Sequence, residues 1–281
     1  MRVLILTLLG GALVAGLAAQ NTTSIQATQK RAAAKSTIPH APNGKPDLTG
    51  VWQANSTQPG SWEEANAGNG VGGTGANPNA PVAPSSTDRQ SSQGAPYQPE
   101  AAKKVLESYN NRNIDDPTAR CLPAGIPRLH SLGLFPMQIV QTPTQIVMLY
   151  EYTNVFRVIP LNAKHPDDIV PTYMGDSVGR WEGDTLVVDM TGFNDRTWLA
   201  GAGTFHTEAL HITERYKRVS KDRIDYEAAM DDPNVFTKPW IYKSSMMLRE
   251  GTHLQEYICA EDNRDVQEYE KLLKEGVKFQ R

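Results

Sequence analysis

Charged side chains lie at alternate positions within apolar stretches of the chain, and these residues have the types and spacing that could do chemistry. Successive side chains of a β-strand point to opposite faces, so residues two apart share a face. Arg157 shares a face with Val155 and Ile159. Glu214 shares a face with Ile212 in the same way. Three more glutamates have apolar neighbours at this spacing: Glu151, Glu208 and Glu256.

Burial of these charges would have a physical consequence. An isolated buried charge costs several kcal/mol, so it must pair, change its protonation state, or contact water or a ligand. If the apolar faces point inward, we expect an interior network of Arg157 with Glu151, Glu214 or Glu256. An interior carboxyl with a raised pKa could act as a general acid or base. The alternative, equally compatible with the sequence, places these residues near strand ends in contact with solvent.

His206 and Glu208 lie two residues apart where a loop meets a predicted strand. A His-x-Glu pair could bind a metal ion or act as an acid–base pair. His211 would face the other side of that strand, which disfavours a three-ligand site. A separate surface role for each histidine is therefore favoured, and we expect no metal. The candidate catalytic residues are Glu214, Glu256 and His206.

Two short motifs share letters with known signatures but lack their context. Residues 68–75 are rich in glycine, but no Gly-Lys-Ser/Thr ending follows and no apolar strand leads in, so a phosphate-binding loop is disfavoured. Residues 175–179 read Gly-Asp-Ser-Val-Gly, yet they lead from a loop into a strand, whereas a nucleophile elbow leads from a strand into a helix. We expect no cofactor.

The composition limits the class of protein. The chain has 281 residues, 39% of them hydrophobic, which is enough for one sizeable core. The formal net charge of −3 gives no electrostatic reason to expect nucleic acid or an anionic membrane as a partner. The expected partner is a small-molecule ligand, and the sequence predicts no oligomeric state.

The N-terminus has the pattern of a secretory signal at residues 1–19. Arg2 supplies a positive start, residues 3–14 form a short apolar run, and small residues precede a cleavage site near Ala18 or Ala19. We expect a periplasmic or extracellular protein with no stable membrane anchor after signal removal; an uncleaved anchor is the alternative. Residues 20–45 resemble a flexible leader.

Cys121 and Cys259 are the two cysteines of the chain. An even number of cysteines in an exported protein favours a disulfide, and two buried free thiols are the alternative.

Apolar alternation and short turns predict an antiparallel meander. The clearest hairpin joins 178–183 to 185–193 through Gly183-Asp184. A helix is predicted near 100–112 and an amphipathic C-terminal helix at 262–281. Residues 54–99 form a low-complexity insertion, either a linker or a binding arm. The predicted strands are 47–53, 138–142, 145–151, 154–161, 178–183, 185–193, 208–219, 223–232, 240–250 and 253–259.

An open meander of this length would expose two long edges, which natural sheets avoid. We therefore predict an all-β fold in which residues 46–261 close into a barrel of about 8–10 strands.

Gly50-Val51-Trp52 in a first strand, followed by a meander and a late helix, resembles the lipocalin-like (calycin-like) barrels. That resemblance implies an enclosed cavity. Residues 46–52, 121–123, 179–188 and 191–194 also resemble an uncharacterised family of exported bacterial proteins, which implies no activity.

Three functions are compatible with this interpretation. We favour binding of a small, mostly apolar molecule in the barrel. The alternatives are an acid–base enzyme of hydrolase, lyase or isomerase type in the same cavity, and a structural surface protein whose insertion is a contact arm. The candidate mouth residues are Trp198, Phe205, Tyr173 and Met174. The candidate ligand-binding residues are Arg157, Glu151, Trp198, His206, Glu208, Glu214 and Glu256.

Overall fold

The computed structural model describes residues 38–54, 95–111, 115–130, 135–200, 203–261 and 263–277. The expected signal at 1–19, the leader before residue 38 and residues 55–94 of the insertion lie outside the described residues.

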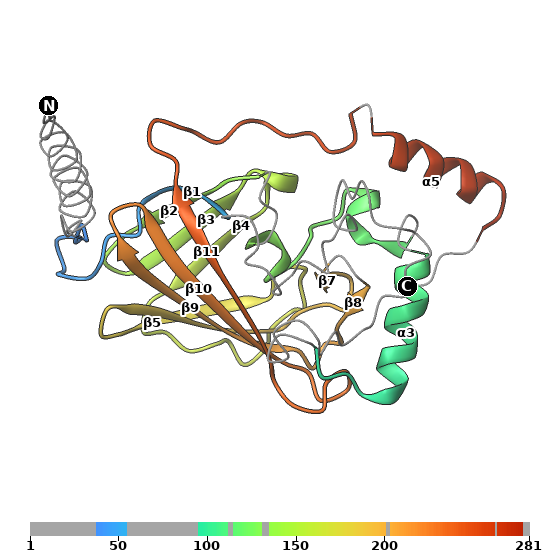
Figure 1. Ribbon diagram of the computed structural model, residues 1–281, viewed down its shortest axis with the longest axis horizontal. Helices are drawn as coiled ribbons and strands as arrows, with labels where there is room; N and C mark the ends of the chain where they lie inside the picture. The colour runs from blue at the N-terminus through green and yellow to red at the C-terminus, as the bar shows by residue number, and fades with distance from the viewer. Residues whose placement is uncertain are drawn as a thin grey trace, which may run out of the picture. The chain divides into compact units, whose positions relative to one another are not determined.

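Nine strands of the described chain form one antiparallel sheet that curls into a nearly closed barrel (Figure 1). Its order is β4-β3-β2-β1-β11-β10-β9-β6-β5, so neighbours in the sheet follow the chain as in a meander, except where the first strand, β1, pairs with the last, β11. The all-β fold predicted from the sequence is confirmed. The strands are β1 (Gly50–Ala54), β2 (Met137–Gln141), β3 (Gln145–Tyr150), β4 (Phe156–Pro160), β5 (Asp176–Glu182), β6 (Thr185–Thr191), β9 (His211–Ser220), β10 (Arg223–Asp231) and β11 (Trp240–Leu248).

The predicted hairpin is present as β5 and β6. Glu182 pairs with Thr185 across the two-residue turn. Gly183 has a φ of 59° at the first central position, where a type II′ turn takes glycine. The turn therefore sets the register that turns Leu186 and Met190 into the core.

The number of strands in the ring is odd, and this determines how the ring closes. Strand direction alternates along the sheet, so the two outer strands of nine, β4 and β5, run the same way. They meet at one isolated parallel bridge between Leu161 and Gly179. Asn162 N donates a hydrogen bond of 2.7 Å to Gly179 O beside it. Parallel neighbours need a crossover connection, which residues 162–175 provide.

The predicted strand at 253–259 is wrong. This segment has no strand partner, and Glu256 in it is exposed. β11 already pairs with β10 on one side and β1 on the other, so the ring has no edge for a tenth strand there. β9 begins at His211 rather than at the predicted residue 208. Thr207 N and Oγ1 donate hydrogen bonds to the buried Asp232 carboxylate, and these hydrogen bonds hold the chain in a bend before the strand.

Helix α3 (Pro99–Asn110) confirms the helix expected near 100–112. Pro99 begins it, where a missing N–H leaves no hydrogen bond unmade. Ala101, Val105 and Tyr109 are buried at helical spacing. The C-terminal helix is present as α5 (Arg264–Lys274) and packs against η2 (Pro117–Arg120).

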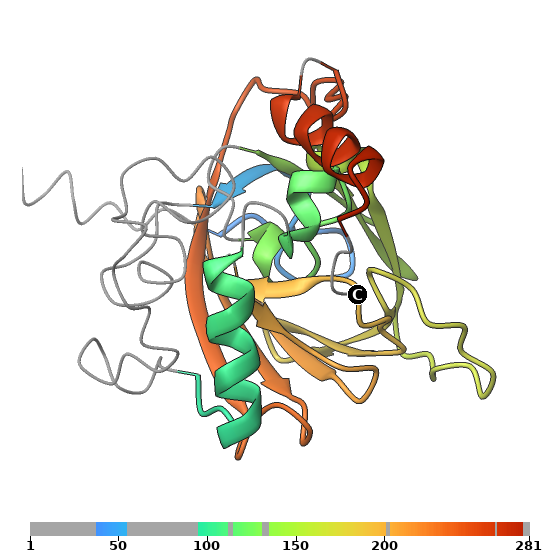
Figure 2. The ribbon, with the colours of Figure 1, turned by 90° about the vertical axis from the view of Figure 1, so that its right-hand side faces the viewer.

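One end of the barrel is covered by short elements that the sequence pattern did not predict. A small hairpin, β7 (Trp198–Ala200) with β8 (Thr204–Phe205), contacts η3 (Arg128–His130) and α3. Figure 2 looks onto this end, with α3 and α5 in front of the strands. One further 3₁₀ turn, η4 (Tyr152–Asn154), follows β3.

The predicted disulfide between Cys121 and Cys259 is present, with Cα atoms 5.5 Å apart. It ties the segment before β2 to the segment after β11. Within the described part of the chain, no helix has the length and apolar character needed to cross a membrane.

Candidate functional site

An ion pair lies in the barrel interior. Arg157 on β4 donates a 2.6 Å hydrogen bond from Nη2 to Oε2 of Glu214 on β9, and neither side chain is more than 2% exposed. Tyr216 and Tyr226 donate their hydroxyls to the other carboxylate oxygen at 2.9 and 2.7 Å. The Glu214 carboxylate therefore has the partners that a buried charge requires.

The network extends from Arg157 to neighbouring strands. Nη1 donates to the Tyr150 hydroxyl at 3.3 Å, and Nη2 also lies 3.2 Å from Ser177 Oγ. The Tyr150 hydroxyl lies 3.0 Å from His130 Nε2. His130 Nδ1 faces Glu214 at 3.4 Å. The network thus joins β3, β4, β5 and β9 to η3.

Electrostatics keep this ion pair charged. Burial raises the pKa of Glu214, but the Arg157 guanidinium and the contact with His130 outweigh it and hold that pKa well below its usual range. Burial lowers the pKa of His130 despite the nearby carboxylate, so this imidazole is neutral. A carboxylate that stays ionised and hydrogen-bonded is suited to holding the barrel together rather than to exchanging protons.

Two other members expected in this network lie elsewhere. Glu256 is exposed on the segment that is not a strand. Glu151 follows β3 and accepts a 2.7 Å hydrogen bond from Gln255 N. Glu208, the partner of His206 in the His-x-Glu pattern, is exposed in the turn before β9.

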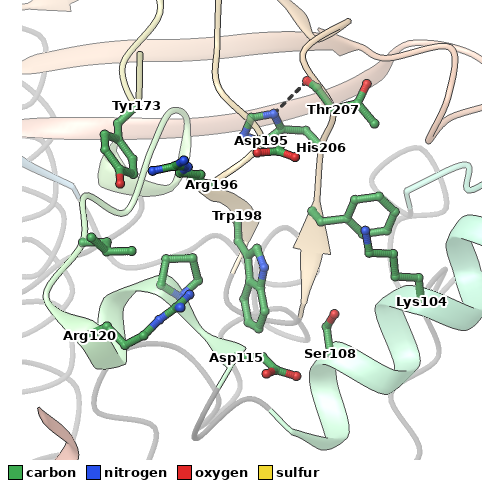
Figure 3. A pocket seen from close by; sticks show the side chains of 13 residues that line it. Lys104, Ser108, Asp115, Arg120, Tyr173, Asp195, Arg196, Trp198, His206 and Thr207 are labelled. Carbon is green, nitrogen blue, oxygen red and sulfur yellow. Dashed lines mark hydrogen bonds between the residues drawn. The ribbon is translucent and has the colours of Figure 1, made fainter. Parts of the chain in front are cut away.

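A cavity of about 560 Å³ lies between α3, η2, the β7–β8 hairpin and the crossover loop (Figure 3). Of the expected mouth residues, Trp198, Phe205 and Tyr173 line it, whereas Met174 packs in the core. His206 also lines it, and Arg157 and Glu214 do not. The described residues that line it are Lys104, Ser108, Asp115, Pro117, Arg120, Leu122, Tyr173, Asp195, Arg196, Trp198, Phe205, His206 and Thr207.

His206 is held in one tautomer at the cavity wall. Its Nδ1 lies 3.0 Å from the Thr207 carbonyl oxygen, which only accepts, so Nδ1 carries the proton. Nε2 then accepts the 2.7 Å hydrogen bond from Thr197 Oγ1. Burial lowers the pKa of His206, which leaves the ring neutral.

Charged groups ring the cavity. Lys104 Nζ lies 4.1 Å from the centre of the Phe205 ring, a cation–π contact. Arg120 and Arg196 add two guanidinium groups, and Asp115 and Asp195 add two carboxyls. Burial raises the pKa of Asp115, against the opposing effects of Arg120 and Asn111. These charged residues were missed from the sequence because they lie on an exposed helix face and in irregular segments without periodicity.

His165 links the crossover loop that carries Tyr173 to strands β5 and β6. Its Nδ1 lies 2.5 Å from Asp176 Oδ1 and its Nε2 lies 3.0 Å from Asp189 Oδ1. Both ring nitrogens face carboxylates, which requires the doubly protonated imidazolium. His211 Nε2 contacts the other oxygen of Asp189 at 2.9 Å. Among the described side chains, no group of three or more histidine, cysteine or acidic residues is placed to hold a metal ion.

The fold and the site together define a nearly closed antiparallel barrel with an ionic core and a separate cavity at one end. Comparisons with protein-family models, with curated proteins and with solved structures found no match.

Proposed function

We propose that the protein is an exported lipocalin-like binding protein that takes a small, mostly apolar molecule into the cavity at the end of its barrel. The observation that carries this proposal is the cavity itself. Its volume of about 560 Å³ falls in the range of roughly 300–1,000 Å³ typical of small-molecule sites. Trp198, Phe205 and Tyr173 offer aromatic surface for an apolar ligand.

The cavity is favoured over the centre of the barrel because of how the centre is filled. Arg157, Glu214, Tyr216 and Tyr226 are 0–4% exposed and satisfy one another there. A ligand in the centre would have to break this network. At the barrel end it meets side chains that already line an opening.

Export is part of the proposal. The pattern of residues 1–19 supports a signal peptide, and the Cys121–Cys259 disulfide fits an oxidising compartment such as the periplasm or the cell exterior.

Titration with N-phenyl-1-naphthylamine, an uncharged aromatic probe that fluoresces in apolar surroundings, tests the proposal. Saturable one-to-one binding is expected. Phe205→Ala should weaken it about five- to tenfold, because one aromatic contact contributes roughly 1 kcal/mol. Phe156→Ala is the matched control, since Phe156 is 61% exposed and lies outside the cavity lining. Equal effects of the two variants would contradict the proposal, and so would the absence of saturable binding by both this probe and its sulfonated analogue, 8-anilinonaphthalene-1-sulfonate.

An acid–base enzyme is the second candidate, and one observation favours it. Asp115, whose pKa burial raises, lines the same cavity as His206. A carboxyl that holds its proton longer can donate it to a bound substrate. Glu214 and Glu256, the carboxylates expected in this role, do not line the cavity. Asp115→Asn should abolish turnover while leaving probe binding in place if this candidate is correct, and a binding protein shows no turnover in either form.

A further inference from the structure

We infer that the ligand of this cavity carries an anionic group, such as a carboxylate, sulfonate or phosphate, which Arg196 and Arg120 bind beside its aromatic or apolar body. This inference rests on the proposed function and names the chemical class of the ligand.

Among the described residues, no carboxylate lies within ion-pair distance of the cations of the cavity. Lys104, Arg120 and Arg196 form no ion pair with the side chains that the structure describes. Several arginines elsewhere in the described chain do pair, as Arg128 does with Asp116 at 2.7 Å. Three cations around one opening, without an ion pair among the described residues, create a positive potential that favours an anion.

Arg120 keeps hydrogen-bond donors available. Its guanidinium carbon lies 5.7 Å from the centre of the Tyr269 ring, a contact that uses the cation and none of its N–H groups. Its buried Nε has no hydrogen-bond partner among the described residues. A planar guanidinium with free donors matches the two oxygens of a carboxylate or a similar anion.

The two acids of the cavity do not cancel this charge. Among the described lining residues, three cations face two carboxyls, Asp115 and Asp195. Burial raises the pKa of Asp115, so the cavity favours the uncharged form of this carboxyl more than water does. The balance therefore remains positive.

The arrangement of the side chains indicates where the aromatic body and the anionic group of the ligand would lie. In Figure 3, Arg196, Arg120 and Tyr173 lie on one side of Trp198, and Lys104 lies on the other side. An aromatic body against Trp198 would bring an attached anion to the two arginines. The site thus suits an amphipathic aromatic acid rather than a fully apolar molecule.

A matched pair of probes tests this inference. 8-Anilinonaphthalene-1-sulfonate differs from N-phenyl-1-naphthylamine by a single sulfonate, so the ratio of their dissociation constants measures the contribution of the anion. The wild-type protein should bind the sulfonate at least about tenfold more tightly. Arg196→Gln should reduce this preference about three- to tenfold. Arg196 is exposed, so the substitution removes charge without disturbing the core.

Arg249→Gln is the control, because Arg249 is also exposed and lies outside the cavity lining. It should leave the preference for the sulfonate unchanged. Equal affinity for the two probes in the wild type, or equal effects of the two arginine substitutions, would overturn the anion inference while leaving the proposed function in place. Failure of both probes to bind would overturn the proposed function and the inference with it.

Discussion

Replacing Arg157 by methionine would leave the Glu214 carboxylate without its cation at a position where neither side chain reaches solvent. The two side chains are 2% and 0% exposed and their atoms lie 2.6 Å apart. Removing one partner of a buried pair costs about 3–5 kcal/mol. We expect about 3 kcal/mol, because the Tyr216 and Tyr226 hydroxyls still donate to the carboxylate and methionine fills the space of the arginine stem.

The assay is urea unfolding with comparison of the free energy of unfolding at constant m-value. Arg180→Met is the surface control. Arg180 pairs with Glu182 at the same 2.6 Å, but both side chains are 40% or more exposed, so its loss should cost less than about 1 kcal/mol. The double variant Arg157→Met with Glu214→Gln should recover part of the loss, since the uncompensated charge is gone.

The pH dependence of the free energy of unfolding is an independent test of this reasoning. In the wild type, the folded-state pKa of Glu214 lies below the unfolded value, so its contribution to stability is lost as pH falls. In Arg157→Met, burial acts without the guanidinium and the folded-state pKa rises above the unfolded one, so stability is lost as pH rises. The gap between the two proteins should therefore narrow as pH falls from about 7 towards about 4. A loss below about 1 kcal/mol for Arg157→Met, with a gap that does not change with pH, would refute the reasoning.

Three further predictions follow from other contacts. The folded-state pKa of His165 is raised, because two carboxylate hydrogen bonds outweigh the lowering effect of burial, so its stabilisation is complete below about pH 6.5 and is lost as pH rises through the higher folded-state value. His165→Gln should remove this pH dependence from hydrogen exchange of residues 162–175, and equal pH profiles would contradict it. Replacing Cys121 and Cys259 together by serine should cost up to about 4–5 kcal/mol in the chain-entropy model, because the bond spans 138 residues; a loss under about 1 kcal/mol in urea unfolding would argue against it. Gly125→Ala should lower the unfolding midpoint more than Gly44→Ala, since both have positive φ but only the added Cβ at Gly125 would lie 2.6 Å from Thr197 Oγ1; equal shifts would show that the close approach does not matter.

The fold could be predicted because apolar and polar side chains alternate along strands of a sheet that has one buried face. The inward side chains Ile212, Glu214 and Tyr216 of β9 stand out at period two, and short turns require antiparallel neighbours. The same alternation placed Arg157 and Glu214 inside. The prediction for Glu256 was wrong because its local pattern resembles a strand, whereas β11 already pairs with β1 and β10 and leaves no edge for another strand.

The cavity was only partly predictable. Trp198, Phe205 and Tyr173 were expected at the mouth because aromatic residues in long loops next to a barrel are natural ligand contacts. The cations were not, because Arg120 ends a short 3₁₀ turn and Arg196 lies in a loop, where side-chain direction has no period. Only the three-dimensional path of the chain brings these residues to one opening.

Arg157 also lies at the point where the barrel of nine strands closes. β4 and β5 share one backbone bridge where other neighbours share a full ladder. From β4, the Arg157 guanidinium contacts Ser177 on β5 and Glu214 on β9, so it spans this join from the inside. The disulfide lies outside the β4–β5 join and cannot hold it. The barrel is therefore closed by a side chain as well as by backbone, and the carboxylate that holds this side chain supports the join between the two outer strands.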